Sequence, residues 1–321
     1  MTDSRPSHPA IVTTALTKQY TEALALHEVS LKVETGSIFG FLGPNGAGKT
    51  TTIKLLLGFT SPTSGKAEIF GHETWRDGVE ARRHIGFLVQ ADAFYPDMSG
   101  RSQLELAARL SGRSPALQGQ LLDLLELANR DLDRKVVQYS KGMKQKLALV
   151  AAAQHDPPLL ILDEPTEGLD PLIQRRFEQF LRECNGRGRT IFMSSHDLAE
   201  VERLCQEVAI VREGQLVVTE SIERIRQMRV RQVDVTFAGA APEDLSWLDG
   251  VQVLAVAGRR WTLAIEDAID PLIKVLATSD VEDLTVVPPS LDDVFMTYYD
   301  PKAPVEHTSD GSRVETLGGA R

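Results

Sequence analysis

The stretch Gly43-Pro44-Asn45-Gly46-Ala47-Gly48-Lys49-Thr50, with Thr51 following, decides the fold of this chain. The apolar run at residues 37–42 just before it predicts a buried strand, and residues 52–57 after it predict a helix. The pattern G-x-x-x-x-G-K-[ST] between a strand and a helix is typical of a phosphate-binding loop. The alternative, a glycine-rich turn that only connects the two elements, does not account for an eight-residue match in this context. The sequence therefore predicts a nucleoside triphosphate site.

Each part of this loop has a chemical task. Its three glycines, Gly43, Gly46 and Gly48, let backbone N–H groups close on the β- and γ-phosphates, and the helix N-terminus adds the positive end of its dipole. Lys49 would place a point charge on the β/γ oxygens, and the Thr50 hydroxyl would coordinate Mg²⁺.

Composition excludes several classes of protein. The chain has 321 residues, 42% of them hydrophobic and 25% charged, which is ordinary for a globular protein of one large domain or one large and one small. It contains no run of the roughly 18 apolar residues that a membrane helix needs, and its first residues lack a signal core. Cys184 and Cys205 give neither a disulfide framework nor a metal-ligand spacing, so we expect a reducing cytoplasm. The net charge of −10 argues against a general grip on nucleic acid.

Strand and helix patterns alternate along residues 37–218. Apolar runs at 85–89, 159–162 and 190–195 read as buried strands, which predicts a mainly parallel sheet flanked by helices. Residues 102–128 are expected to be helical and to be split near Pro115. Six leucines in this region are expected to form a core stripe: Leu104, Leu110, Leu117, Leu121, Leu124 and Leu125.

The pattern changes around Ser221. The later strands are expected at 233–237, 251–257, 261–265 and 284–287, and the helices at 242–247 and 270–278. The order β-α-β-β-α-β predicts a small ferredoxin-like α+β module. Residues 1–10 and 301–321 are polar and expected to be disordered.

Polar residues at the ends of two predicted strands could act on a nucleotide. Asp163 follows four aliphatic residues and could hold Mg²⁺, while Glu164 could polarise a water for in-line attack on the γ-phosphate. A solvated acidic turn is the alternative for this pair. His196 follows the strand at 190–195 and could bond the γ-phosphate and the attacking water, or could simply cap the next helix.

Taken together, these segments resemble the nucleotide-binding domain of an ATP-binding-cassette (ABC) transporter. The resemblance rests on the phosphate loop, Gln90 after a strand, Tyr139-Ser140-Lys141-Gly142 at a helix start, residues 159–164, Gly168-Leu169-Asp170 and His196. Their order and spacing match across about 220 residues. Lys141 and Met143 depart from the usual signature Leu-Ser-Gly-Gly-Gln, and such variants resemble the drug- and polymer-exporter branch.

The resemblance implies roles for residues that are ambiguous alone. Tyr20 would stack on adenine, and Gln90 would touch Mg²⁺ and relay the nucleotide state to a membrane partner. Ser140 and Gly142 would contact ATP of a second monomer, and Asp170 would lie in the loop that crosses between monomers. Glu164 and His196 would be catalytic. The implied ATP site comprises Tyr20, Gly43, Pro44, Asn45, Gly46, Ala47, Gly48, Lys49, Thr50, Thr51 and Gln90, with Mg²⁺ on Thr50, Gln90 and Asp163.

The resemblance also implies the architecture. The fold is expected to be an α/β P-loop NTPase with a RecA-like core, an antiparallel β subdomain and a helical subdomain, followed by the ferredoxin-like module. We expect an ATP-binding domain at 11–221, with its helical subdomain at about 91–153, and an accessory domain at 222–300.

The implied function is that of the ATP-hydrolysing subunit of an export system. Two copies, or one copy and a paralogous ATPase, would sandwich ATP and Mg²⁺ and drive a separate polytopic permease from the cytoplasmic face of the membrane. The cargo would be a drug, antibiotic, lipid or polymer. No nucleic acid partner is expected. Two alternatives remain, namely a soluble ABC ATPase of translation or DNA repair and a P-loop kinase, which leaves Ser140 and His196 unexplained.

Overall fold

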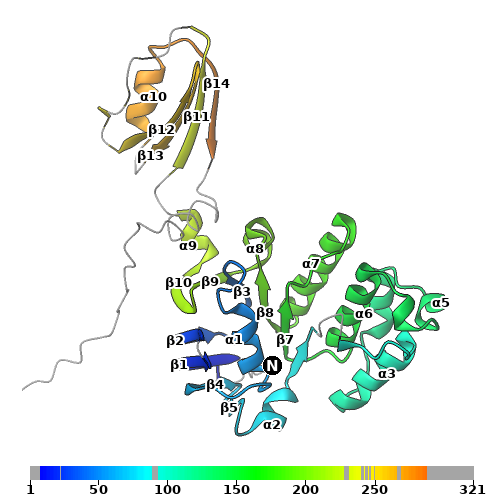
Figure 1. The fold of residues 1–321 in the computed structure, drawn as a ribbon. Coiled ribbons are helices and arrows are strands. Elements are labelled where there is room, and N and C mark those ends of the chain that lie inside the picture. Colours follow the sequence, from blue (N-terminus) through cyan, green and yellow to red (C-terminus); the bar gives the residue numbers. More distant parts are fainter. Residues whose placement is uncertain are drawn as a thin grey trace, which may run out of the picture.

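A computed structural model gives the arrangement of the chain (Figure 1). The structure describes residues 8–287 except 22, 89–92, 228–230, 240–241, 243–244, 246, 249 and 266–268. Gln90, the predicted disordered ends at 1–7 and 301–321, and the end of the accessory domain at 288–300 lie outside the described residues. In the described part, no helix is long and apolar enough to cross a membrane.

A six-stranded, mainly parallel sheet forms the centre of the cassette, as the alternating pattern predicts. Its strand order is β10-β9-β3-β8-β7-β6, and only the β9–β10 pairing is antiparallel. Strands β3 and β8 are buried along their whole length, and β7 is nearly so, because other elements pack against both faces of the sheet. The strands are β3 (Ile38–Leu42), β6 (Ile85–Phe87), β7 (Leu159–Asp163), β8 (Thr190–Ser195), β9 (Glu207–Arg212) and β10 (Gln215–Ser221).

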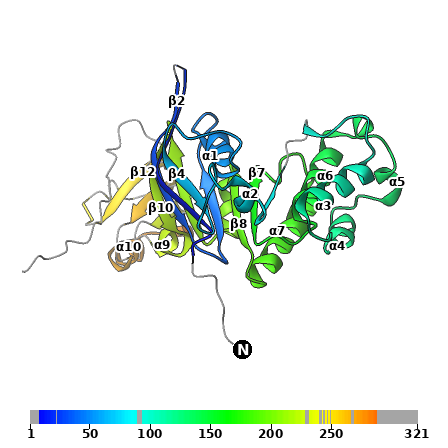
Figure 2. The same ribbon diagram turned by 90° about the horizontal axis from the view of Figure 1, so that it is seen from below.

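An antiparallel four-stranded sheet packs beside it, in the order β2-β1-β4-β5 (Figure 2). Its apolar side chains share one core with α1 and with inward residues of β3 and β8, including Phe39, Phe41 and Phe192. This core holds the helix that follows the phosphate loop against the sheet. The elements are β1 (Ile11–Tyr20), β2 (Ala23–Val33), α1 (Lys49–Leu56), β4 (Ser64–Ile69), β5 (His72–Glu73) and α2 (Gly78–Arg82).

A group of helices lies at the other side of the sheet, next to α7 (Figure 1). The break predicted near Pro115 is confirmed, because one helix ends at Ser111 and the next begins at Gln118. Leu104, Leu121 and Leu125 are fully buried. The prediction for Leu110 is wrong, since its side chain is 80% exposed on the outer face near the helix end. The helices are α3 (Gly100–Ser111), α4 (Gln118–Leu124), α5 (Asn129–Leu132), α6 (Lys141–Ala153), α7 (Pro171–Gly186) and α8 (Leu198–Leu204).

The C-terminal residues form a third sheet with its own core. The strand order is β12-β13-β11-β14, and every pairing is antiparallel, as the predicted β-α-β-β-α-β order requires. The first predicted helix, at 242–247, falls largely on residues outside the description. Helix α9 (Ile222–Gln227) precedes this sheet, and its Ile222 and Ile225 belong to the core of the cassette instead. The remaining elements are β11 (Arg231–Phe237), β12 (Val251–Ala257), β13 (Arg260–Ile265), α10 (Asp270–Leu276) and β14 (Val281–Val287).

Candidate functional site

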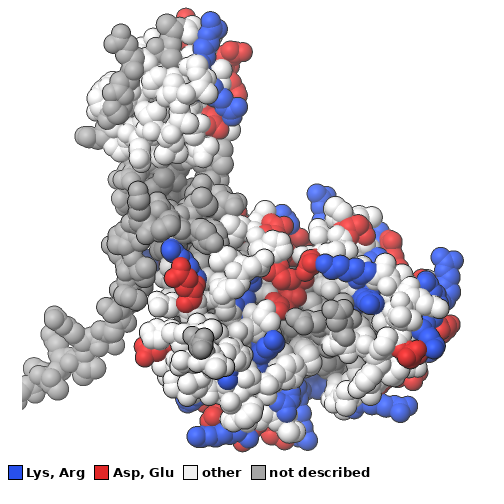
Figure 3. All heavy atoms as spheres, in the orientation of Figure 1, with Lys and Arg blue, Asp and Glu red and all other residues white. Residues whose placement is uncertain are grey.

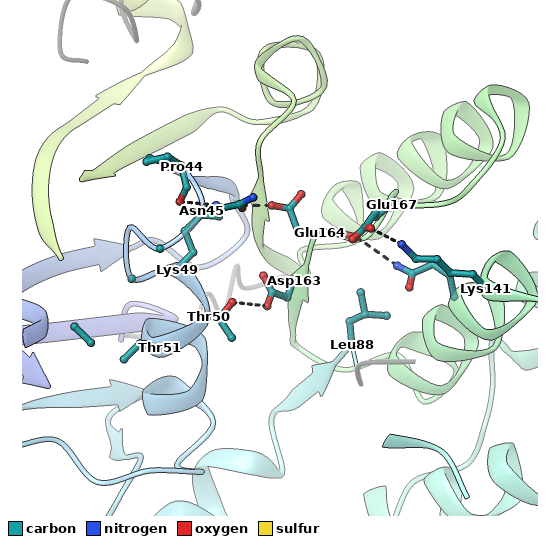
Figure 4. Close-up of a pocket in the computed structure, with 14 residues that line it drawn as sticks. Pro44, Asn45, Lys49, Thr50, Thr51, Leu88, Lys141, Asp163, Glu164 and Glu167 are labelled. Carbon is teal, nitrogen blue, oxygen red and sulfur yellow. Dashed lines mark hydrogen bonds and ion pairs between the residues drawn. The ribbon is translucent and has the colours of Figure 1, made fainter. Parts of the chain in front are cut away.

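The predicted nucleotide site is a cavity of about 420 Å³ at the carboxyl edge of the central sheet. Strands β3, β8 and β7 are neighbours, so the loops that follow them meet at one edge, where open α/β sheets bind ligands. Figure 4 shows the side chains that converge there. The lining residues are Ala25, Pro44, Asn45, Gly46, Gly48, Lys49, Thr50, Thr51, Leu88, Lys141, Gln145, Asp163, Glu164 and Glu167.

The phosphate loop has the backbone shape that its glycines were expected to allow. Gly48 has φ +108°, and a Cβ there would lie 2.8 Å from the carbonyl oxygen of Ala25 and 2.7 Å from the Leu26 side chain. Any other residue would therefore be strained and would clash. Helix α1 begins at the next residue, which turns its free N–H groups toward the cavity.

Lys49 is the buried cation of the site, with only 7% of its surface exposed. Its ammonium donates to the Gly43 carbonyl at 2.5 Å and to the Pro44 carbonyl at 3.3 Å. It also lies 3.8 Å from Glu164 Oε1. A nearly buried ammonium held on the loop's own backbone is placed to meet phosphate oxygens that enter the loop.

Thr50 and Asp163 form a pair of oxygen ligands of the kind that Mg²⁺ prefers. The Thr50 hydroxyl donates to Asp163 Oδ2 at 3.2 Å, and the Ser194 hydroxyl donates to Asp163 Oδ1. The carboxylate is thus oriented by β8 and faces the loop hydroxyl across the cavity (Figure 4). Hard oxygen donors on two sides of the phosphate position fit a hydrated Mg²⁺.

Glu164 follows Asp163 in a strained backbone conformation. Its φ is +49°, the left-handed region, which is uncommon for a non-glycine residue. The Glu164 N–H donates to the Ser194 hydroxyl at 3.1 Å and to the Ser194 carbonyl at 3.3 Å. The Gln145 side-chain amide donates to the Glu164 carbonyl at 3.4 Å. These contacts fix a turn that presents the carboxylate to the cavity.

His196 does not itself line the cavity, but it contacts Glu164, which does. Its Nδ1 lies 2.7 Å from Glu164 Oε2, so the ring donates to the ionised carboxylate in the tautomer that carries the proton on Nδ1. The imidazole is 67% exposed, whereas the carboxylate is only 21% exposed. The cap of α8 is instead Asp197, whose side chain accepts from Glu200 N–H. The structure therefore places His196 at Glu164 and gives the capping role to its neighbour.

The N-terminus of α6 forms the opposite wall. Lys141 Nζ lies 2.5 Å from Glu167 Oε1, and this hydrogen bond lowers the pKa of the Glu167 carboxyl. Gln145, one turn further along α6, donates to the carbonyl of Pro165 at 2.9 Å. A Cβ on Gly142 would lie 3.1 Å from the Gly168 carbonyl, so this helix packs closely on the loop that follows Glu164.

Several predicted site residues do not line this cavity. Ser140 is exposed and caps α6 by accepting from the Met143 N–H at 3.2 Å. Asp170 is exposed and caps α7, and the N–H of Ile173 that it accepts lowers its pKa. Tyr20 is 42% exposed at the β1–β2 hairpin, where Lys18 Nζ lies 4.9 Å from the centre of its ring. Gly43 and Ala47 belong to the loop but face its interior.

The sequence did not reveal three residues that hold the site together. Ser194 was read only as part of a strand, although its hydroxyl contacts both Asp163 and Glu164. The sequence assigns no role to Gln145 or Glu167, which contact the Pro165 carbonyl and Lys141 in the structure. The one available signal for Ser194 is a buried polar residue at the end of an apolar strand, beside the strand that carries the carboxylates.

Comparisons with known proteins place this site in a family. The family model described as ABC transporter matches residues 26–167, from β2 to the loop after Glu164. The chain is 41% identical over 209 residues to the bacitracin transport ATP-binding protein BcrA of Bacillus licheniformis, covering 64% of this chain and 68% of that protein. It is 39% identical to the Nod factor export ATP-binding protein I of Burkholderia orbicola, covering 61% and 66%.

A third relative matches over nearly its whole length. The ABC transporter ATP-binding protein YhcH of Bacillus subtilis is 31% identical over 287 residues, which is 88% of this chain and 93% of that protein. Among solved structures, an ATP-binding subunit of an ABC transporter superposes with a TM-score of 0.63 at 32% identity, over 68% of this chain and 92% of that one. A bacterial ABC transporter cassette, solved as a dimer, gives 0.59 at 25% identity, over 66% and 98%. The chain therefore belongs to the ABC transporter family, as one of its ATP-binding, ATP-hydrolysing subunits.

Proposed function

We propose that two copies of this chain, or one copy and a paralogous ATPase, close around two ATP molecules and power a separate membrane permease. Each ATP would be held by the phosphate loop of one chain and by Ser140 and Gly142 of the other. The observation that carries this proposal is that His196 contacts Glu164, which lines the same cavity as Lys49. It joins a general base to a cavity with the charge and backbone donors for a triphosphate.

The dimer is supported by the position of the signature residues. Ser140 and Asp170 are exposed helix caps that do not line the cavity of their own chain, so each is free to meet a second chain. Gly142 lies at the start of the same helix. Tyr20, exposed at its hairpin tip, would stack on adenine. Gln90 would complete the site as a Mg²⁺ ligand, and it lies outside the described residues.

Hydrolysis would use this chain's residues as follows. Glu164 accepts a proton from the water that attacks the γ-phosphate, and His196 keeps the carboxylate turned toward that water. Lys49 offsets the charge of the β- and γ-phosphate oxygens. Thr50 and Asp163 would hold Mg²⁺, which would supply positive charge to offset the negative charge that develops on the phosphate oxygens.

The names of two relatives support a permease partner and export as the direction of transport. Two of them are named for bacitracin transport and Nod factor export, and the signature variant at Lys141 and Met143 led to the same exporter branch. We therefore propose export of a drug, antibiotic, lipid or polymer, with this subunit bound to the permease at the cytoplasmic face of the membrane. The names of these relatives do not favour a translation or DNA-repair ATPase.

The division of labour along the chain is also a proposal. We assign ATP binding to residues 11–221, with the helical subdomain at about 91–153, and an accessory role to residues 222–300. The core of the C-terminal sheet is separate from the cores of the cassette, which supports two domains. Ile222 and Ile225 nevertheless pack with the cassette.

The phosphate role of Lys49 can be tested by measuring nucleotide affinity directly. Lys49→Ala removes the cation, and we expect the Kd for Mg-ATP to rise at least tenfold, because a charge-assisted contact to phosphate is lost. Lys54→Ala, on the exposed side of the same helix, is the matched control and should bind like the parent. If the Lys49 variant bound Mg-ATP with unchanged affinity, Lys49 would not contribute to phosphate binding. Co-purification of the tagged chain with a polytopic membrane protein tests the partner.

A further inference from the structure

Glu200 is a buried carboxyl that the proposed hydrolysis does not use. It lies in the first turn of α8, and only 2% of its surface is exposed. Its Oε2 accepts the hydroxyl of Ser195 at 2.8 Å, whereas Oε1 is buried without a well-formed hydrogen bond to the described residues. Burial raises the pKa of this carboxyl, and the side chains of Ser195 and Thr166 oppose the change. Burying such a group is unfavourable, so its presence calls for an explanation.

Helix capping explains only part of this arrangement. Asp197 and Glu200 have the spacing of a capping box, in which the glutamate would accept the N–H of the capping residue. Here the Asp197 N–H instead donates to Ser195 Oγ at 3.0 Å, and the Ser195 hydroxyl in turn donates to Glu200 Oε2. The carboxyl therefore fixes the residue that immediately precedes His196.

Glu200 also lies close to the second loop of the site. The side chain of Thr166, two residues after Glu164, is near enough to oppose the rise in the pKa of this carboxyl, although the carboxyl's well-formed hydrogen bond among the described residues is the one from Ser195. The two loops beside Glu200 are those that bring His196 Nδ1 to within 2.7 Å of Glu164 Oε2. Glu200 itself does not line the nucleotide cavity. One buried side chain thus lies between the loop after β7 and the loop after β8 and is hydrogen-bonded to the latter.

We propose that Glu200 is a positioning residue for ATP hydrolysis, which holds the His196 loop in register with the Glu164 loop. This inference rests on the proposed roles of Glu164 and His196. Displacing a catalytic group by about 1 Å can lower a rate on the order of a hundredfold. Since Glu200 touches neither the cavity nor the phosphate loop, its loss changes kcat and leaves nucleotide affinity unchanged.

The test measures kcat and the Kd for Mg-ATP separately, on the full-length chain. Glu200→Ala removes the hydrogen bond to Ser195 and the contact with the Thr166 loop, and we expect kcat to fall about tenfold or more with Kd within about twofold, as for other groups that orient a reactive residue. Glu200→Gln keeps a carbonyl that accepts from Ser195, so its kcat should stay within about threefold of the parent.

A matched control and a second variant keep the test decisive. Glu178→Gln alters another buried carboxyl, 4% exposed, which pairs with Arg203 of α8 at 3.0 Å but contacts neither loop. It should lower stability without lowering kcat. Should Glu200→Ala fail to fold, Ser195→Ala removes the same hydrogen bond from the other side and should lower kcat similarly.

Two results would overturn the proposal. The first is a parent-like kcat in both Glu200→Ala and Ser195→Ala. The second is an equal loss in the Gln and Ala variants of Glu200, which would assign the effect to charge rather than to hydrogen bonding. A wrong assignment of the hydrolytic site would give a different result from a wrong role for Glu200. In that case the parent chain would hydrolyse no ATP, or its rate would not change when Glu164 is substituted.

Discussion

Glu164 is the residue on which the proposed chemistry depends, and its backbone sets it apart. A non-glycine residue held at a positive φ is disfavoured by about 1–3 kcal/mol. The surrounding contacts must offset this strain, and Ser194 supplies two of them through its hydroxyl and its carbonyl. The strain has a local consequence, since it turns the carboxylate away from the direction of β7 and toward His196.

His196 provides a test of this pair at the level of one side chain. We expect His196→Ala to lower kcat by a factor of roughly 10²–10³, because the carboxylate loses the group that orients it in the transition state. The Kd for Mg-ATP should change by less than about threefold, since the Lys49 contacts remain. Steady-state ATP hydrolysis and equilibrium nucleotide binding measure the two quantities.

His27→Ala is the control for this prediction. His27 is exposed on β2 and does not line the cavity, so its variant should hydrolyse ATP at the parent rate. A His196 variant with parent kcat would show that the contact to Glu164 does not contribute to hydrolysis.

At the residue scale, sequence reasoning found the residues that belong to recognised motifs and missed those outside them. Lys49, Asp163 and Glu164 lie in patterns with a known chemical task, which predicts them directly. Ser194 and Gln145 acquire a role only when β8 lies beside β7 and α6 packs on the loop after Glu164. Such roles arise from tertiary neighbours and leave no periodic signal in the chain.

At the scale of elements, the opposite end of β7 and β8 is fixed by an ion pair. Asp156 precedes β7 and Arg189 precedes β8, and the two side chains make two parallel hydrogen bonds. This bidentate pair holds the strand starts in register, about one strand length from the site at their other ends. The hydrogen bond from Arg189 lowers the pKa of the Asp156 carboxyl.

The pH dependence of this contribution has a definite sign. Because the folded-state pKa of Asp156 lies below its unfolded value near 3.8, the pair stabilises the fold above that pH and loses its effect as the pH falls below it. We expect Asp156→Asn to reduce the free energy of unfolding by about 1–2 kcal/mol at pH 7 and pH 5, and by less at pH 3.5. Urea unfolding at the three pH values measures this.

An exposed pair serves as comparison. Asp133 and Arg101 are 65% and 44% exposed, so Asp133→Asn should change stability by less than about 0.5 kcal/mol. If the difference between Asp156→Asn and the parent grew as the pH fell from 5 to 3.5, the assigned sign would be wrong.

Element types were predictable where the period was long and the ends were marked. The break at Pro115 and the start of α6 after Ser140 both follow from residues that cannot continue or that cap a helix. The prediction that Leu110 belongs to the core was wrong. Leu110 lies in the last turn of α3, where the leucine spacing continues although the side chain is exposed to solvent. The two-residue strand β5 carries no period, so no sequence pattern could indicate it.

At the scale of the molecule, we propose that two chains are needed to complete each nucleotide site. Its cavity contains the phosphate loop, Asp163 and Glu164, while the two helix caps Ser140 and Asp170 lie outside it. On the face shown in Figure 3, acidic and basic side chains are interspersed over the cassette. These features favour a second copy as the missing half of each site.

The mass of the Glu164→Gln variant in the presence of Mg-ATP tests this account most directly. The substitution keeps the size and the hydrogen bond of the side chain but removes the base, so ATP should bind and remain intact. Light scattering should then give twice the 35.3 kDa of one chain with ATP and a single chain with ADP, while ATP turnover falls below detection. A variant that stayed monomeric with ATP bound, or that hydrolysed ATP at the parent rate, would contradict the account.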